Sequence, residues 1–408
     1  MIALSSLRAR RAIAEVISCA FALVSLGYAV ITAPGRGSDL VAFAATGREW
    51  LTGAFQFGTA LVPLYPPFAV PFMALLTLFP SDALVIAGLL INLAATVAVV
   101  LLTVKLYGEH WPARVWLYLA ACLLASAPYR VTLRMGQNSL LITALLLAAL
   151  LAWQRKQRVL SGACLGLSLC KYSLTLPFLL YFFWKREWKV AGTALIVMVV
   201  LTEIFAWHLG MTFTAAITSW LRTTAEVQTA GQTAFTGATE IKPLIYSLTG
   251  ENIALTSTLT IVVAVMGLAA MTLVFARRPQ AVNVHFAILA LYALWMAYHR
   301  TYDSVLCILP AALLIDWLLR GSFIRFSRFW LVGLGLLIIS LPGLLTERLG
   351  LSEDRLANNL AGRLGLHIER LLVVGLFVSL LLLLWRSDPS PQTDAASGPF
   401  VALANQRG

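Results

Sequence analysis

Asp39 is the first residue of this chain whose type and position could support catalysis. It lies in the stretch "GRGSDLVAFAATGREW" (35–50), immediately after the first long apolar run. Leu40, Phe43 and Gly47 follow at the spacing of one helical face, so a short amphipathic helix is expected here. Either Ser38 or Asp39 could cap that helix. A helix cap and a general base therefore both explain this carboxylate.

Two arginines in "APYRVTLRMGQNSLL" (127–141) could bind an anion. Arg130 and Arg134 are four residues apart, which places them on the same face of a helix. A guanidinium binds phosphate oxygens through two parallel hydrogen bonds, so the pair fits a phosphate group. Snorkelling of both side chains to lipid headgroups is the alternative. Gln137, after Gly136, could hydrogen-bond a sugar or could only separate two helices.

A later turn, "YHRTYD" (298–303), contains three further polar candidates. His299, Arg300 and Asp303 lie between two apolar runs, and His299 and Asp303 are four residues apart. A self-satisfied polar turn explains them as well as a binding site does. The sequence contains no HExxH, no DxD and no cluster of three ligand-type residues at close spacing, so we expect no metal and no cofactor.

Lys171 and Tyr65 complete the set of candidates. Lys171 lies in "CKYS" between two short apolar segments, and a lysine at membrane depth is costly enough to suggest a function. Snorkelling to the headgroups is again the alternative. Tyr65 lies in "LVPLYPPFAVPF" (61–72), where Pro66 and Pro67 suit the start of a helix and the tyrosine suits the interfacial aromatic belt.

The composition indicates the elements that must position these residues. Of 408 residues, 60% are hydrophobic and only 12% are charged, whereas soluble domains carry about a quarter charged residues. The apolar runs are continuous and rich in Leu and Ala, without the alternation of a barrel strand. The fold class is therefore an all-α polytopic membrane protein. Thirteen apolar segments are present: 11–32, 67–79, 83–104, 113–128, 138–152, 159–170, 173–184, 190–209, 253–275, 281–298, 304–319, 329–345 and 369–385.

The net charge of +12 is distributed unevenly along the chain. The short connections 153–158, 185–189, 276–278 and 318–328 are basic, whereas the opposite connections are nearly balanced in charge. This is the positive-inside pattern, so the charge predicts orientation and not nucleic-acid binding. Both termini are then expected in the cytoplasm, with about twelve crossings and an uncleaved signal anchor at the N-terminus.

The outer side collects the candidates in this topology. It would contain a first loop (33–66), the turn at Gln137, a long loop (210–251) and the turn at His299. The long loop contains an amphipathic segment, "TFTAAITSWLRTTAEV", expected to lie on the membrane surface. The segments 159–170 and 173–184 are too short to span and should form a hairpin with Lys171 near its tip.

The remaining segments suggest little chemistry. The five cysteines fall within or beside apolar segments and suggest neither disulfides nor a metal site. Residues 1–385 should form a single transmembrane domain. The Pro- and Ser-rich stretch 386–408 should be a disordered cytoplasmic tail.

The order of these motifs resembles glycosyltransferase family 87. The likeness covers about residues 8–320 and rests on "SDLVAFAATGREWLTG", "LYPPFAVPFMALLTLFP", "MGQNSLLITALLLAALLA", "LSGACLGLSLCKYSLTLPFLLYFFWKREWK" and "HRTYD". The resemblance implies a GT-C fold, a helical bundle with an extracytoplasmic active site near the first loop. It also implies a polyprenyl-phosphate sugar as donor, mannose in the best-known members, and an acid of the first loop as catalytic base.

By position, Asp39 matches that acid. Arg130, Arg134, Lys171 and Arg300 are then the candidates for the donor phosphate, and Tyr65, Gln137, His299 and Asp303 for orienting the substrates. The acceptor would be a lipid or glycan, and the protein a monomer of the plasma (inner) membrane. One strong carboxylate favours an inverting displacement, because retaining glycosidases need two about 5 Å apart. A membrane transporter or lipid flippase is the alternative, and it would not depend on one first-loop acid.

Overall fold

The computed structural model describes a helical protein. The described residues are 15–16, 19–20, 22–28, 30–31, 37–58, 65–230, 240–249, 252–297, 299–339 and 367–386. No β-strand occurs in these ranges, and the all-α fold class is confirmed. The predicted tail 386–408 lies outside the described residues except for Arg386.

The helices follow the apolar segments closely. The α-helices are α2 (Ser38–Leu51), α3 (Val70–Ala74), α4 (Ser81–Tyr107), α5 (Ala113–Ala125), α6 (Ala127–Met135), α7 (Ser139–Gln154), α8 (Arg158–Ser168), α9 (Tyr172–Trp184), α10 (Trp188–His208), α11 (Phe213–Ala230), α12 (Lys242–Leu248), α13 (Ile253–Arg277), α14 (Val282–Met296), α15 (Ile308–Leu319), α16 (Ile324–Ile339) and α20 (Ile368–Arg386). Four short 3-10 segments accompany them: η2 (Pro67–Ala69), η3 (Leu75–Leu78), η4 (Leu169–Lys171) and η5 (Thr301–Cys307).

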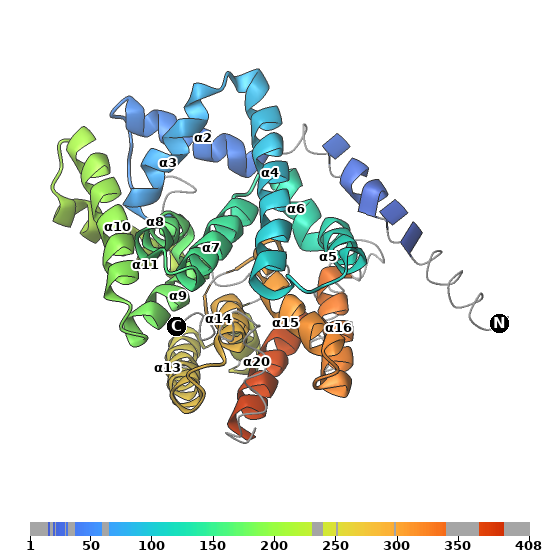
Figure 1. Cartoon of the computed structure of the whole chain (residues 1–408). Helices are drawn as coiled ribbons and strands as arrows, with labels where there is room; N and C mark the ends of the chain where they lie inside the picture. Colours follow the sequence, from blue (N-terminus) through green and yellow to red (C-terminus); the bar gives the residue numbers. More distant parts are fainter. Residues whose placement is uncertain are drawn as a thin grey trace, which may run out of the picture.

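Helices α7 and α14 form the interior of the bundle (Figure 1). Both are apolar on all sides, and most of their side chains are buried. A helix without a polar face has to be covered all round by protein or lipid. Around α7 lie α4 and α8, and around α14 lie α9, α15 and α20. Polar residues at the ends of these two inner helices are therefore enclosed by the surrounding helices.

The segments α8 and α9 form the predicted hairpin. Helical turns continue from Arg158 to Trp184, 27 residues that by length and composition alone could form one span. A straight helix of that length would be about 40 Å long. Arg158 Nη2 nevertheless lies 2.9 Å from Glu187 Oε1, just beyond the other end. The chain therefore reverses within this segment. At Lys171 the backbone leaves the helical region, with φ −116° and ψ 68°.

Two glycines fix how the hairpin packs on α10. A Cβ on Gly162 would lie 2.5 Å from the carbonyl oxygen of Val190, and one on Gly166 would lie 2.9 Å from that of Ala194. Small residues of this kind let helix backbones approach closely within a membrane. The contacts advance together along both helices, so α8 runs parallel to α10. This packing fixes the hairpin tip at the end of the molecule where α7 begins.

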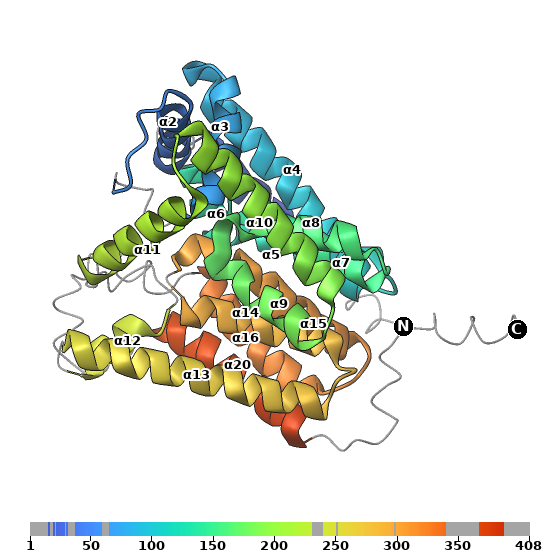
Figure 2. The same cartoon turned by 90° about the vertical axis from the view of Figure 1, so that its left-hand side faces the viewer.

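The basic connections gather at the opposite end. Trp153 Nε1 donates to Glu187 Oε1 at 2.8 Å, and Lys185 Nζ donates to the carbonyl oxygen of Pro279 at 2.6 Å. Asp316 accepts from Trp111 Nε1 at 3.2 Å and binds Arg320 Nε at 2.9 Å. The helices run between this end, at the right of Figure 2, and the end carrying α2, α11 and α12 at the left. The basic connections of the sequence thus lie together at one end of the molecule, opposite the end that carries α2, α11 and α12.

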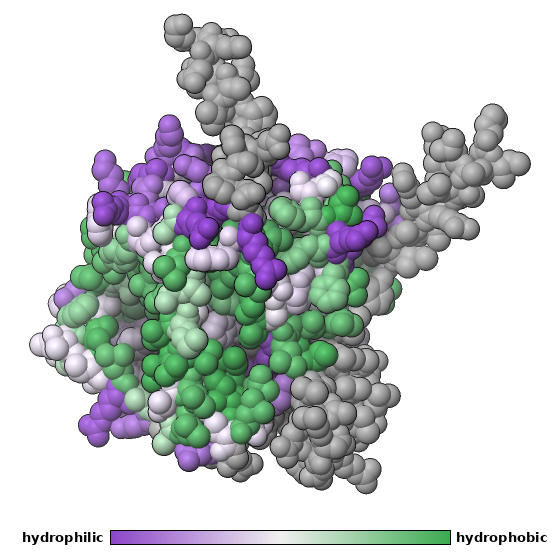
Figure 3. Space-filling view, turned by 90° about the horizontal axis from the view of Figure 1, so that it is seen from below, coloured by the Kyte–Doolittle hydropathy of each residue, from purple (hydrophilic) through white to green (hydrophobic). Residues whose placement is uncertain are grey.

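The surface and the helix lengths fit a membrane protein. Figure 3 shows a face whose middle is hydrophobic, while hydrophilic residues gather along its upper edge. Among the described residues, six helices are long and apolar enough to span, or seven if the bent pair α5–α6 is one span. The predicted number of about twelve crossings is not confirmed. Helix length alone does not decide the number of crossings. The α8–α9 hairpin is counted among the six candidate spans although it reverses direction, and the apolar helices α7 and α14 are too short to be counted.

One predicted segment divides into two helices. The apolar run 113–128 was expected to be continuous, but it breaks at Ser126, and α6 leaves α5 at 57°. Ser126 caps α6 by accepting from the backbone N–H of Tyr129 at 3.2 Å, and Pro128 lies in the first turn. Both features favour a new helix start at this point. The break directs α6, with Arg130 and Arg134, toward α2 and η5.

Candidate functional site

Asp39 lies in the first turn of α2, but it does not cap the helix. Gly37 is the capping residue, and no side chain completes the cap, so the capping explanation is wrong for both Ser38 and Asp39. The carboxylate of Asp39 instead accepts a hydrogen bond from Gln137 Nε2. The buried face of α2, formed by Leu40, Phe43 and Gly47, holds the helix against the bundle as the sequence predicts.

A glycine allows this contact between α2 and the Gln137 turn. Gly136 ends α6 in the left-handed region, with φ +69° and ψ 33°. A Cβ at this position would lie 2.5 Å from Leu40 Cβ. Only glycine combines this backbone conformation with so close a neighbour. Gly136 therefore brings the first turn of α2 within hydrogen-bonding distance of Gln137.

Gln137 joins three other candidates. It is only 3% exposed, and its Oε1 accepts from Lys171 Nζ at 3.4 Å and from the Tyr65 hydroxyl at 3.5 Å. Its amide N–H group donates to Asp39. The amide oxygen faces the two donors, Lys171 and Tyr65, and the amide nitrogen faces the Asp39 carboxylate, as an amide in this orientation requires. The Gln137 amide thus connects the carboxylate of Asp39 to the ammonium group of Lys171.

Lys171 forms a buried ion pair with Asp303. The distance from Lys171 Nζ to Asp303 Oδ1 is 2.5 Å, and both side chains are almost fully buried. Snorkelling of Lys171 to the headgroups is therefore wrong. Ser139 Oγ connects the pair, because it accepts from Lys171 Nζ at 2.8 Å and donates to Asp303 Oδ1 at 2.7 Å. The ring of Tyr302 lies 4.6 Å from Lys171 Nζ.

His299 completes a hydrogen-bonded network, whose other members are Asp39, Tyr65, Gln137, Ser139, Lys171 and Asp303. Its Nδ1 lies 3.0 Å from Asp303 Oδ2, and the side chain is fully buried. The other nitrogen, Nε2, is buried and has no hydrogen-bond partner within the described ranges. A buried polar atom without a partner costs about 1–3 kcal/mol, so such atoms are rare without a reason. His299 is thus oriented through Nδ1, while its Nε2 lacks a partner among the residues that the structure describes.

The charges of the network are unequal. One ammonium group, on Lys171, faces the two carboxylates of Asp39 and Asp303. Burial raises the pKa of the Tyr65 hydroxyl well above its usual value, and neighbouring Tyr302, Asp303 and Asp39 add to the rise. Tyr65 consequently remains a neutral donor. A phosphate entering this site would therefore need a further cation.

The two arginines of α6 differ in their surroundings. Arg130 Nη1 donates to the carbonyl oxygen of Ala125 at 2.5 Å and to Ser25 Oγ at 3.4 Å. Arg134 is half-buried, and its Nε has no partner among the residues that the structure describes. Its neighbour Met135 lies beside α2, with Sδ 3.9 Å from Ser38 Oγ. Arg130 thus holds neighbouring backbone, whereas the Nε of Arg134 has no partner among the described residues of the chain.

Arg300 occupies a different environment from the rest of the set. It immediately precedes η5, and its side chain is exposed. Hydrogen bonds and ion pairs bring together six of the candidates, namely Asp39, Tyr65, Gln137, Lys171, His299 and Asp303. Ser139 was missed by the sequence reasoning, although it bridges Lys171 and Asp303.

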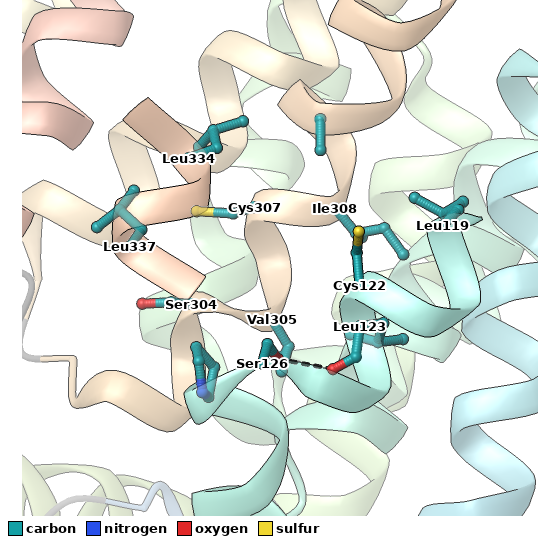
Figure 4. Close-up of a pocket in the computed structure, with 12 residues that line it drawn as sticks. Leu119, Cys122, Leu123, Ser126, Ser304, Val305, Cys307, Ile308, Leu334 and Leu337 are labelled. Carbon is teal, nitrogen blue, oxygen red and sulfur yellow. Dashed lines mark hydrogen bonds between the residues drawn. The ribbon is translucent and has the colours of Figure 1, made fainter. Parts of the chain in front are cut away.

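An apolar pocket lies between α5, η5 and α16 (Figure 4). Ser304, the residue after Asp303, forms part of its wall, and so does Pro128 of α6. The other lining residues are Leu119, Cys122, Leu123, Ser126, Val305, Cys307, Ile308, Ala311, Leu334 and Leu337. This lining suits a hydrocarbon chain.

Comparison with known proteins identifies one family. The model of glycosyltransferase family 87 matches residues 64–307, more than half of the chain. The matched region includes Tyr65, Gln137, Lys171, His299 and Asp303. No curated protein and no solved structure matches this chain.

Proposed function

The chain belongs to glycosyltransferase family 87 and is a membrane glycosyltransferase, and we propose that it transfers mannose from a polyprenyl phosphate to a lipid or glycan acceptor. The observation that carries this proposal is the hydrogen-bonded series from Asp39 through Gln137 to Lys171, Asp303 and His299. It offers one accessible carboxylate, a rigid support for that carboxylate and an imidazole nitrogen that has no partner in the described part of the chain.

Asp39 acts as the general base in the proposed reaction. Its carboxylate takes the proton of the acceptor hydroxyl as that oxygen attacks C1 of the donor sugar. The bond between C1 and the phosphate oxygen breaks, and polyprenyl phosphate leaves with the bonding electron pair. Because attack and departure occur on opposite faces of C1, the configuration inverts. Gln137 and, through it, Lys171 hold the carboxylate in the orientation that this step requires.

The donor phosphate requires a cation besides Lys171. The network already contains two carboxylates for one ammonium group, and Lys171 is engaged by Asp303. Arg134 is the best candidate, because its Nε is buried and lacks a partner among the described residues. His299 Nε2 would contact the sugar or the phosphate. Arg130 and Arg300 remain weaker candidates for the phosphate, since one holds the α5–α6 break and the other is exposed.

The donor's lipid and the sidedness complete the proposal. The apolar pocket next to Ser304 would accept the first isoprene units of the donor. The end with the basic connections would face the cytoplasm, together with both termini, and the network would face the outer side of the plasma (inner) membrane. Residues 1–385 would act as one GT-C-like domain, without a partner chain.

A transfer assay tests the proposal against its main alternative. Purified protein is incubated with polyprenyl-phosphate mannose and a membrane lipid extract, and the anomeric configuration of the product is determined by NMR. We expect mannosylated product of inverted configuration. Movement of the lipid-linked sugar across proteoliposomes without any transfer would instead support a flippase. A product of retained configuration would overturn the single-base mechanism.

A further inference from the structure

The amphipathic helix α11 contributes an aromatic residue to the surroundings of the network. Trp220 packs edge-to-face on Tyr172, with ring centroids 5.5 Å apart and an interplanar angle of 86°. Tyr172 directly follows Lys171 at the hairpin tip. Ala216, one helical turn before Trp220, is fully buried, so this face of α11 packs against the protein. Trp220 therefore packs on the hairpin tip, against the residue that follows Lys171.

The indole N–H of Trp220 is the unusual feature. Its Nε1 is buried and has no acceptor within the part of the chain that the structure describes. By contrast, the Nε1 atoms of Trp50, Trp111 and Trp153 each donate to an oxygen at 2.8–3.2 Å. Trp295 also lacks an acceptor among the described residues, but it is 2% exposed and enclosed in the core, whereas Trp220 is partly exposed. A buried donor without an acceptor is costly unless a ligand supplies one.

The chemistry around Trp220 favours a neutral, hydroxyl-bearing ring. Two aromatic rings meet there, and the nearby cation, Lys171, is already paired with Asp303. The apolar face of a pyranose can pack on an aromatic ring, while one of its hydroxyl groups accepts the indole N–H. We propose that Trp220 and Tyr172 form a carbohydrate subsite at the mouth of the active site. This inference rests on the proposed glycosyl transfer, and either the donor mannose or a sugar of the acceptor could occupy the subsite.

The test uses two substitutions of Trp220 and a matched control. Trp220→Phe keeps an aromatic ring against Tyr172 but removes the N–H donor, and Trp220→His restores a ring N–H. Trp207→Phe is the control, because Trp207 is 82% exposed at the end of α10. We expect Trp220→Phe to raise KM about tenfold for one sugar substrate, as the loss of one buried hydrogen bond would. We expect kcat to stay within about twofold, Trp220→His to recover part of the loss, and Trp207→Phe to resemble the wild type.

Separate titrations identify the occupant. Varying polyprenyl-phosphate mannose at fixed lipid extract, and then the reverse, shows whether the donor or the acceptor KM rises. Unchanged values of both in an active Trp220→Phe would overturn the subsite. If the wild-type protein transfers no sugar, the proposed function fails, and saturation-transfer NMR with methyl mannoside, glucoside and galactoside decides the subsite alone. Binding that weakens in Trp220→Phe supports it; equal binding, or none to the wild type, overturns it.

Discussion

The substitution Gly136→Ala tests whether close packing at α2 positions the proposed base. The new Cβ would lie 2.5 Å from Leu40 Cβ, whereas carbon atoms in contact are about 3.5–4.0 Å apart. Relief of this clash requires α2 to move by about 1 Å, and a misplacement of that size costs about 10²-fold in rate. Asp39 would move with Leu40, because the two residues are adjacent in the first turn of α2.

A second glycine provides the control for backbone strain. Gly53 has φ +73°, and a Cβ there would have nothing within 4 Å. Gly53→Ala should cost about 1–2 kcal/mol of stability, because a residue other than glycine is strained in the left-handed region. Gly136→Ala should cost more, because it adds the clash with Leu40 to the same backbone strain. Only Gly136→Ala should lower kcat, by about 10²-fold. The assay measures kcat and thermal unfolding for both variants in one detergent. A Gly136→Ala enzyme as active as Gly53→Ala would refute the positioning argument.

The remaining predictions concern the ion pair and the arginines. Lys171→Met should cost about 3–5 kcal/mol of stability, because it leaves Asp303 buried and unpaired, and adding Asp303→Asn should restore part of it in denaturant titrations. Arg222→Ala, which breaks an ion pair that is 83% exposed on the arginine side, should change stability by about 1 kcal/mol or less. Arg134→Gln should raise the donor KM about tenfold through loss of a charged hydrogen bond to the phosphate. Arg130→Gln should mainly lower thermal stability, and equal donor KM values in the two arginine variants would contradict this assignment.

Most elements of the bundle could be predicted from the sequence because each depends on a local pattern. Continuous apolar runs gave the helices, and the polar residue Lys171 between two short runs indicated the hairpin. The break at Ser126 was missed because hydropathy stays high across it, although Ser126 and Pro128 are a recognisable helix start. The number of crossings does not follow from hydropathy, which does not distinguish a span from a helix that doubles back.

The candidate site could be predicted only residue by residue. Gln137, Lys171 and Asp303 stand out as polar groups among apolar segments, but the contacts that join them depend on the packed bundle. Lys171 and Gln137 are 34 positions apart, and Asp303 and its partner Ser139 are 164 positions apart. Ser139 gave no signal, because a serine at the start of a helix is common. Arg130 and Arg134 are four residues apart and share one face of α6, so the sequence did not indicate that their surroundings would differ.

The proposed role of Asp39 is tested most directly by Asp39→Asn in a single-turnover assay with polyprenyl-phosphate mannose. Glu49→Gln is the control, since it neutralises another carboxylate of α2. Removal of the general base should lower the rate of transfer by about 10²- to 10⁴-fold, while donor affinity and the rate of the control stay near those of the wild type. Transfer by Asp39→Asn at the wild-type rate would contradict the assignment of Asp39 as the catalytic base.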